Sequence, residues 1–222
     1  MTDSTKKLRL AVLISGTGRT LRNLQERILG HNLGAEIAVV ISSTANAHGL
    51  QFAETATPPL PIRIVERTNY SSREDFSQEI FEACRKAEID YIVLAGFIRK
   101  LTIPSDFDNR VLSIHPSLIP AFCGKGFYGQ HVHEAAIDYG VKLSGCTVHF
   151  LDDGYDKGPV ILQLACDVDA DETPDSLNDK VFELEKIAYP QAIQMLADDR
   201  IEVQERRVFI HPAKGDVNTD VS

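Results

Sequence analysis

The sequence predicts an α/β fold: a Rossmann-like, doubly wound and mostly parallel sheet with an antiparallel C-terminal extension. Three observations predict it. Residues 8–14 form a nearly continuous apolar run, which is typical of a strand buried on both faces of a parallel sheet. A glycine-rich turn at 15–20 follows, and residues 21–29 then show the apolar spacing of a helix. Strand, turn and helix in this order form the opening unit of a doubly wound fold.

The first half of the chain continues this alternation up to a strand that stops at Pro116, which has no N–H for a sheet ladder. A helix over 71–87 is predicted from a serine cap with acidic residues in its first turn. A shorter helix lies between the second and third strands and is ended by prolines. The predicted strands cover 36–42, 62–65, 91–95 and 111–114, and the shorter helix covers 47–56.

The sequence of the second half predicts antiparallel strands in place of the parallel strand–helix alternation. Residues 120–129 form a loop rich in glycine and aromatic residues, and a helix over 131–139 is closed by Gly140. Two strands flank an acidic loop and are expected to pair as an antiparallel hairpin. A long helix and a terminal hairpin complete the fold. The two strands cover 142–151 and 160–168, the helix covers 176–198, and the terminal hairpin covers 200–210.

Composition limits the class of protein. The 222 residues are 43% apolar and 25% charged, as in ordinary globular proteins. They predict a single domain over 1–211 and a disordered tail over 212–222. Neither a membrane-spanning run nor a signal peptide is recognisable, so we expect a cytoplasmic protein without a membrane partner. The net charge of −9 argues against a nucleic-acid partner, although it allows a local cationic pocket.

The four cysteines, at 84, 123, 146 and 166, show no Cys-x-x-Cys spacing. This spacing pattern indicates neither a zinc ribbon nor a dithiol motif, and no metal is expected. We interpret them as reduced thiols. Cys123 lies in the glycine-rich loop and is a candidate reactive thiol, with a structural role as the alternative.

The turn at 15–20 is a candidate anion site. Gly16 and Gly18 flank Thr17, so backbone N–H groups can point at an anion in front of a helix N-terminus. Arg19 and Thr20 add a charge and a hydroxyl. The turn lacks the features of a Walker A motif and the third glycine of a dinucleotide fingerprint, which favours a single phosphate. A tight strand–helix turn without a ligand is the alternative.

His115 is the candidate acid–base residue. It ends an apolar strand, where α/β sheets place their chemistry, and imidazole suits proton transfer near neutral pH. Asp156 lies in the loop between the two antiparallel strands and can reach the same sheet edge. The alternatives are a buried structural histidine and a turn-forming aspartate.

A third candidate group follows the strand at 91–95. Apolar residues beside Arg99 suit a flat heteroaromatic ligand with polar edges, and a solvated loop charge is the alternative. Arg73 is a candidate partner for an acidic ligand tail, with a surface helix charge as the alternative.

Four motifs in this order and spacing resemble the 10-formyltetrahydrofolate-dependent formyltransferases. They are Ser-Gly-Thr-Gly at 15–18, Leu-Ala-Gly-Phe-Ile-Arg at 94–99, Ile-His-Pro-Ser-Leu-Ile-Pro at 114–120 and Asp-Lys-Gly-Pro-Val-Ile at 156–161. The resemblance extends from about residue 8 to 208 and implies the formyltransferase fold. Within the family, the chain looks most like the members that formylate glycinamide ribonucleotide in purine biosynthesis. The resemblance therefore implies small-molecule substrates and a monomer or homodimer.

The implied reaction is attack of the glycinamide ribonucleotide amine on the formyl carbon of 10-formyltetrahydrofolate, through a tetrahedral intermediate. His115 would act as acid and base or stabilise the oxyanion, and Asp156 would raise its pKa and help to move protons. The remaining roles are matched position by position. Ser113 occupies the position at which the family has a catalytic asparagine. The residues matched to the ribonucleotide site are Gly16, Thr17, Gly18, Arg19, Thr20 and Glu185. Those matched to the folate site are Arg73, Ile98, Arg99, Lys100 and Leu101.

Three positions depart from the family pattern. Ser113 replaces the asparagine thought to hold the formyl oxygen; loss of such a donor costs about 10²–10³ in rate. Arg19-Thr20 replaces Ser-Asn, and residues 122–129 form a longer, more basic loop.

Several rivals stay open at the level of sequence. A formyltetrahydrofolate hydrolase would carry an N-terminal regulatory domain, and a methionyl-tRNA formyltransferase a C-terminal tRNA-binding domain; we expect neither here. A sugar-nucleotide formyltransferase shares the histidine and aspartate and differs in its acceptor pocket. A catalytically impaired folate- or nucleotide-binding protein is suggested by Ser113.

Overall fold

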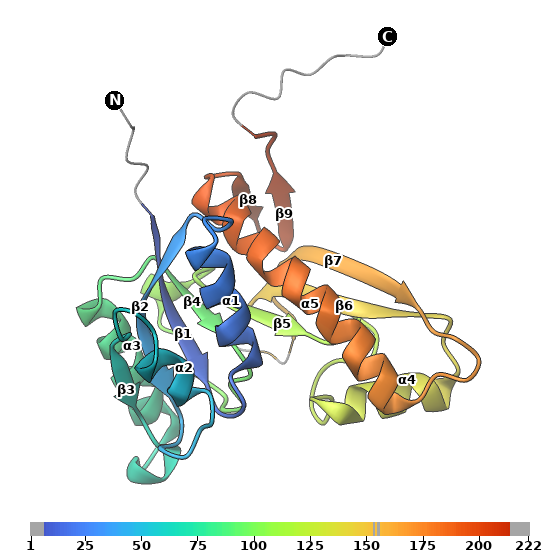
Figure 1. Ribbon diagram of the computed structural model, residues 1–222, viewed down its shortest axis with the longest axis horizontal. Coiled ribbons are helices and arrows are strands. Elements are labelled where there is room, and N and C mark those ends of the chain that lie inside the picture. Colours follow the sequence, from blue (N-terminus) through green and yellow to red (C-terminus); the bar gives the residue numbers. More distant parts are fainter. Residues whose placement is uncertain (1–6, 153, 155, 214–222) are drawn as a thin grey trace.

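The fold is built on a seven-stranded sheet (Figure 1). The computed structural model describes residues 7–152, 154 and 156–213, so the predicted tail lies outside the described residues from 214 onward. Across the sheet the order is β3 (Ile62–Ile64), β2 (Ala35–Ser42), β1 (Leu8–Ile14), β4 (Tyr91–Leu94), β5 (Val111–His115), β6 (Leu143–Phe150) and β7 (Val160–Asp167).

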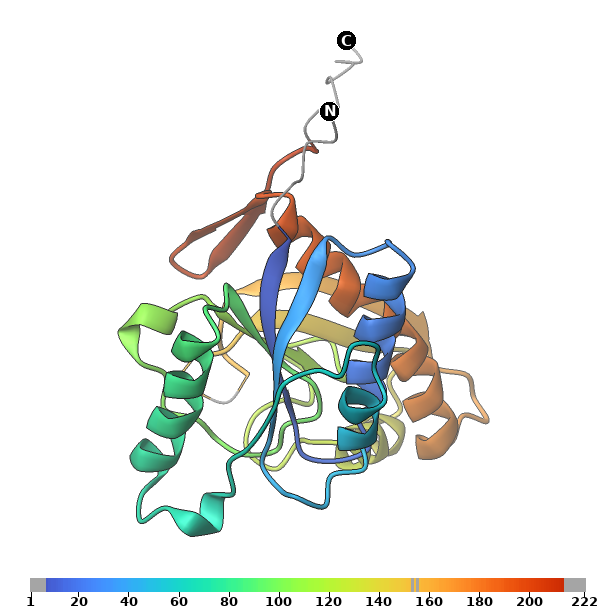
Figure 2. The same cartoon turned by 60° about the vertical axis from the view of Figure 1, so that its left-hand side comes forward.

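Strand directions confirm the predicted fold class. The pairs among β1 to β5 are parallel, whereas β6 runs antiparallel to both β5 and β7. The predicted hairpin around the acidic loop is therefore correct. The terminal hairpin is also confirmed: β8 (Ile201–Gln204) and β9 (Arg207–Ile210) pair antiparallel. Figure 2 shows this hairpin projecting from the body beside the end of the last long helix.

Helices cover both faces of the sheet (Figure 2). The face opposite α3 carries α1 (Arg19–Leu29), α2 (Leu50–Glu54), α4 (Gln130–Tyr139) and α5 (Pro174–Ala197), whereas α3 (Arg73–Lys86) packs on the other face with the short 3₁₀ helix η2 (Ser105–Phe107). A second 3₁₀ turn, η1 (Arg67–Asn69), precedes α3. Helix α2 is shorter than predicted, because the chain at Gly49 is held in a turn against Gly16, whose carbonyl accepts the Gly49 N–H.

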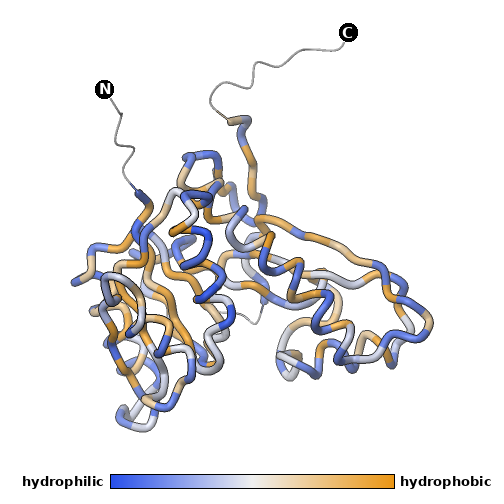
Figure 3. Tube along the Cα trace, in the orientation of Figure 1, coloured by the Kyte–Doolittle hydropathy of each residue, from blue (hydrophilic) through white to orange (hydrophobic). Residues whose placement is uncertain are grey.

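The core explains the apolar run that opens the chain. Leu10 and Val12 of β1 pack into the cluster beneath α1 and α5, whereas Ala11 and Leu13 pack into the cluster beneath α3. Side chains alternate between the faces of a strand, so a strand covered on both faces must be apolar throughout. Figure 3 shows this as largely hydrophobic inner strands beside helices of mixed hydropathy.

Helix α5 contains Pro190 and continues through it. Proline has no N–H, so the carbonyl of Lys186, four residues earlier, loses its helical donor. The Asn23 side chain of α1 donates to that carbonyl at 3.1 Å, which docks the two helices. At its start, Thr173 forms a capping box and Pro174 occupies the first turn, so α5 begins two residues earlier than predicted.

The sheet places three chain segments at one edge. Strands β1, β4 and β5 are parallel neighbours, so the segments that leave their carboxyl ends emerge together. In an open α/β sheet, ligands bind at this edge and where the strand order reverses, which here is between β1 and β4. Within the described ranges, no helix has the length and apolar character needed to cross a membrane.

Candidate active site

A cavity of about 740 Å³ opens at the carboxyl edge of the sheet. It is lined by the glycine-rich turn after β1, the segments after β4 and β5, the loop before α4, the loop between β6 and β7, and side chains of α4 and α5. Every predicted site residue except Arg73 lines it: Gly16, Thr17, Gly18, Arg19, Thr20, Ile98, Arg99, Lys100, Leu101, Ser113, His115, Asp156 and Glu185.

The glycine-rich turn leads directly into α1, whose first residue is Arg19. Gly18 has a left-handed backbone with φ 73°, and a Cβ there would lie 2.4 Å from the Cα of Gly49. Only glycine fits this close approach. Gly18 also supplies no side-chain cap, so the first N–H groups of α1 face the cavity edge without one.

His115 and Asp156 meet in the cavity, as predicted. His115 Nδ1 lies 3.8 Å from Asp156 Oδ2, and the histidine side chain is 6% exposed. Its other ring nitrogen, Nε2, donates to the carbonyl of Phe122 at 2.9 Å. Asp156 Oδ2 in turn accepts the Gly124 N–H at 2.9 Å. The separation from Nδ1 suits an ion pair with imidazolium and is too long for a direct hydrogen bond.

A second histidine, which the sequence reasoning missed, lies on the other side of Asp156. His149 is fully buried on β6; its Nδ1 donates to the Phe150 carbonyl and its Nε2 lies 3.8 Å from Asp156 Oδ1. Burial lowers the pKa of His149, and the nearby Asp156 partly offsets that. Nε2 has no hydrogen-bond partner within the described part of the chain. The sequence around His149 carries no signal of this role, because only the pairing of β6 with β5 brings it opposite Ser113.

Helices α4 and α5 contribute to the cavity lining three more residues that the sequence did not point to: His133, Asn178 and Phe182. His133 is buried, and burial followed by the proximity of His115 lowers its pKa. Phe182 stacks under Arg19, whose guanidinium carbon lies 4.0 Å from the ring centroid. One turn along α5, Glu185 also faces the cavity. Burial raises the pKa of Glu185 to about 7, with Arg19 acting in the opposite direction.

The segment after β4 is tied to the glycine-rich turn. The Ile98 N–H donates to Ser15 Oγ at 3.2 Å, and Ser15 Oγ bonds Ser43 Oγ at 2.7 Å. Ile98 is 71% exposed at the cavity, as is Tyr128 at 63%, so this part of the rim is apolar. An apolar rim beside Arg99 fits the predicted pocket for a flat ring system.

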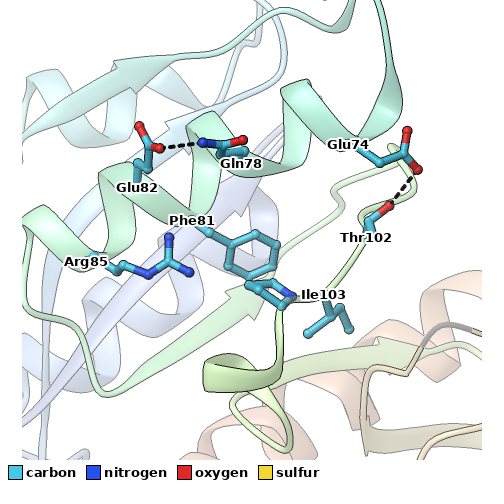
Figure 4. Close-up of a pocket in the computed structure, with 8 residues that line it drawn as sticks. Glu74, Gln78, Phe81, Glu82, Arg85, Thr102 and Ile103 are labelled. Carbon is cyan, nitrogen blue, oxygen red and sulfur yellow. Dashed lines mark hydrogen bonds between the residues drawn. The ribbon is translucent and has the colours of Figure 1, made fainter.

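Arg73 stands apart from this cavity. Its Nε donates to Thr102 Oγ1 at 2.9 Å, and its guanidinium pairs with Glu74. Thr102 directly follows Leu101, which lines the cavity. Arg73 therefore contacts the chain next to the lining without being part of the lining. Glu74 and Thr102 also line a smaller hollow of about 350 Å³ between α3 and residues 102–104 (Figure 4). Its polar side chains bond one another or neighbours: Glu74 with Thr102, Gln78 with Glu82, and Arg85 with Asp106.

Burial raises the pKa of all four cysteine thiols. Burial raises the pKa of Cys84 and Cys146 to about 12. Burial and then the nearby Asp156 raise the pKa of Cys123, which keeps this thiol protonated and favours its structural role. In the ranges that the structure describes, no group of three or more His, Cys, Asp or Glu side chains is placed to hold a metal ion.

Comparisons with known proteins show which family this chain is similar to. Residues 8–193 match the family described as formyl transferase. Over 203 residues the chain is 36% identical to the trifunctional purine biosynthetic protein adenosine-3 of Gallus gallus. The aligned residues make up 90% of this chain and 20% of that protein. This chain thus spans about a fifth of that relative's length.

Solved structures are similar over nearly the whole chain. Glycinamide ribonucleotide transformylase 1 from Symbiobacterium toebii superposes with a TM-score of 0.87 at 36% identity, covering 93% of this chain and 95% of that one. Phosphoribosylglycinamide formyltransferase from Coxiella burnetii gives 0.84 at 33% identity, covering 92% and 93%. Because the family match spans the sheet and every element that lines the cavity up to α5, the protein belongs to the formyl transferase family.

Proposed function

We propose that this protein transfers the formyl group of 10-formyltetrahydrofolate to the amine of glycinamide ribonucleotide, as a cytoplasmic enzyme of purine biosynthesis. The observation that carries the proposal is one cavity that is lined together by the His115–Asp156 pair, the glycine-rich turn and the apolar segment after β4. The similar solved structures named for glycinamide ribonucleotide transformylation support the choice of acceptor.

The acceptor is assigned to the wall made by α1 and α5. The N-terminus of α1 and the Arg19 guanidinium favour an anion such as the substrate phosphate. Glu185 is the group for the ribose hydroxyls, as a hydrogen-bond acceptor when ionised. The folate ring system is assigned to Ile98–Leu101, where apolar surface adjoins the positive charge of Arg99.

The chemistry needs balanced proton transfer. When the amine attacks the formyl carbon, its nitrogen must lose one proton, and the folate nitrogen that leaves must gain one. His115 can take the first and return it to the second, and as imidazolium it also stabilises the negative oxygen of the tetrahedral intermediate. Ser113, two residues earlier on β5, supplies a hydroxyl donor in the same cavity. Asp156 stabilises the imidazolium.

The test is an assay of purified protein with 10-formyltetrahydrofolate, following release of tetrahydrofolate with and without glycinamide ribonucleotide. Acceptor-dependent release with formation of the formylated ribonucleotide is the expected result. Release of tetrahydrofolate without any acceptor would instead indicate a hydrolase. Release only with an amino-sugar nucleotide would show that this nucleotide, and not glycinamide ribonucleotide, is the acceptor. Binding of both ligands without turnover would leave the impaired binding protein as the better account.

A further inference from the structure

We infer that the turn at residues 121–124 is the positioning element of the acid–base pair, and that its Phe122 carbonyl sets His115 to exchange the catalytic proton at Nδ1. The catalytic part of this inference rests on the proposed function. The geometric part, which ring nitrogen carries the proton, can be measured without any substrate.

The argument begins at the buried imidazole of His115. Its Nε2 lies 2.9 Å from the Phe122 carbonyl oxygen. A carbonyl can only accept a hydrogen bond, so Nε2 must carry a proton whenever this bond exists. The bond made by one ring nitrogen thereby fixes the tautomer, and the neutral ring keeps its lone pair on Nδ1.

Nδ1 is the nitrogen that faces Asp156, 3.8 Å from Oδ2. Without a competing acceptor, the carboxylate would favour the tautomer of the neutral imidazole that carries its proton on the facing nitrogen, Nδ1. In that tautomer Nδ1 has no lone pair with which to accept a proton. The Phe122 carbonyl competes with that pull. The same turn also holds the carboxylate, since the Gly124 N–H donates to Asp156 Oδ2 at 2.9 Å.

The turn is held in a strained conformation by its packing and by a buried hydroxyl. Phe122 has φ 46°, a left-handed value that is costly for an aromatic residue and persists only when its surroundings fix it. Its ring packs edge-on against Phe127 and Tyr139, with centroid distances of 6.3 and 5.9 Å. The hydroxyl of Ser117, which is 1% exposed, donates to the Ala121 carbonyl at 2.6 Å.

The proton balance of the proposed reaction then runs through one atom. Nδ1 takes the proton that the attacking amine loses and returns it to the folate nitrogen as the carbon–nitrogen bond to the formyl group breaks. Nε2–H stays bonded to Phe122 throughout. Asp156 is next to the nitrogen whose charge changes, so its attraction is strongest when the imidazolium exists.

The first experiment is long-range ¹H–¹⁵N correlation spectroscopy of the full-length protein with labelled histidine, at a pH at which the His115 ring is neutral. The expected spectrum shows Nε2 in the protonated range and Nδ1 in the unprotonated range. An Nδ1–H tautomer, or an even mixture of the two, would overturn the inference. A pure Nε2–H ring in a protein that transfers no formyl group would uphold the geometry and reject the proposed function.

The second experiment loosens the turn by changing two residues that do not themselves line the cavity. Ser117→Ala removes the hydroxyl that holds Ala121, and Phe122→Gly keeps a left-handed backbone accessible while removing the ring. Ser42→Ala is the matched control, because Ser42 is equally buried and donates to the Thr44 carbonyl at 2.7 Å on β2. We expect both turn variants to show mixed His115 tautomers and a kcat lowered about ten- to a hundredfold, with little change in KM. Ser42→Ala should change neither. Turn variants that fold and retain both the pure tautomer and the wild-type kcat would refute the role of the turn.

Discussion

Ser113 lies directly opposite His149 in the antiparallel ladder between β5 and β6. Directly opposed residues place their side chains on the same face of a sheet, so the buried histidine stands next to the serine that lines the cavity. His149 also faces Asp156 from the side opposite His115. The serine, the two histidines and the aspartate therefore form one group of neighbouring side chains. Ser113, at which this chain departs from its family, belongs to this group.

The first prediction concerns Ser113. If its hydroxyl donates to the developing oxyanion, Ser113→Ala should lower kcat by about 10²–10³ with little change in KM, because the interaction exists mainly in the transition state. Ser113→Asn restores an amide donor and should stay within about tenfold of the wild type. Steady-state kinetics with both substrates measure this. Wild-type kcat in the alanine variant would mean that Ser113 is not the donor.

The second prediction concerns the charge of Asp156. Asp156→Asn retains an oxygen that can accept the Gly124 N–H but removes the negative charge beside His115. We expect kcat to fall by about 10²–10⁴ while the unfolding midpoint changes little. Asp169→Asn is the control, since that carboxylate pairs with Lys180 at the surface. Equal loss of activity in the two variants would point to a general effect of charge rather than to the pair.

The sequence predicted the fold well because each layer leaves a periodic signal. The apolar run of β1 follows from burial on both faces, and the alternating burial of β7 follows from its place at the edge of the sheet. The alternation expected over 142–151 has no such cause, because β6 is buried along nearly its whole length. The residues alone showed that Asp156, in a loop between two strands, could reach the sheet edge that His115 occupies, and the resemblance implied that the two side chains meet.

The parts that escaped prediction depend on contacts without a local pattern. His149 has the alternation of any strand residue, and only the β5–β6 register shows what it faces. The partner of His115 Nε2 is a backbone carbonyl, and every residue has one, so Phe122 carries no distinguishing signal. Arg73 was matched to the folate site by position; its side chain bonds Thr102 and Glu74 outside the cavity lining, and its folate role stays a prediction.

A third prediction addresses how α5 is fixed to the catalytic strands. The Tyr189 hydroxyl is fully buried and lies 3.1 Å from the Leu94 carbonyl and 2.9 Å from the Leu112 carbonyl, at the end of the pairing between β4 and β5. Tyr189→Phe leaves both carbonyls without this donor and should lower the free energy of unfolding by about 1–3 kcal/mol. Urea denaturation with an unchanged slope measures it. Tyr139→Phe, on an 80% exposed side chain, is the control. Equal midpoints for the two variants would contradict the prediction.

A fourth prediction follows from the raised pKa of Glu185, which burial brings from 4.5 to about 7 in the folded chain. Between these values the folded state holds a proton that the unfolded state has lost. The contribution of Glu185 to stability is therefore complete below about pH 4.5 and is lost as the pH rises to about 7. It amounts to at most about 3 kcal/mol, and less because the side chain lines an open cavity.

Glu185→Gln should remove this dependence. The buried histidines contribute the opposite slope, because burial lowers the pKa of His133 and His149, so the informative quantity is the difference between wild type and variant at each pH. That difference should decline from pH 5 to pH 7 and level off above. Urea unfolding across this range measures it, with Glu183→Gln, on the same helix and exposed, as the control. A difference that is flat with pH would mean that Glu185 ionises normally.

The same ionisation should govern acceptor binding: if the carboxylate accepts the ribose hydroxyls, KM for glycinamide ribonucleotide falls as the pH rises through about 7, and this fall should be absent in Glu185→Gln.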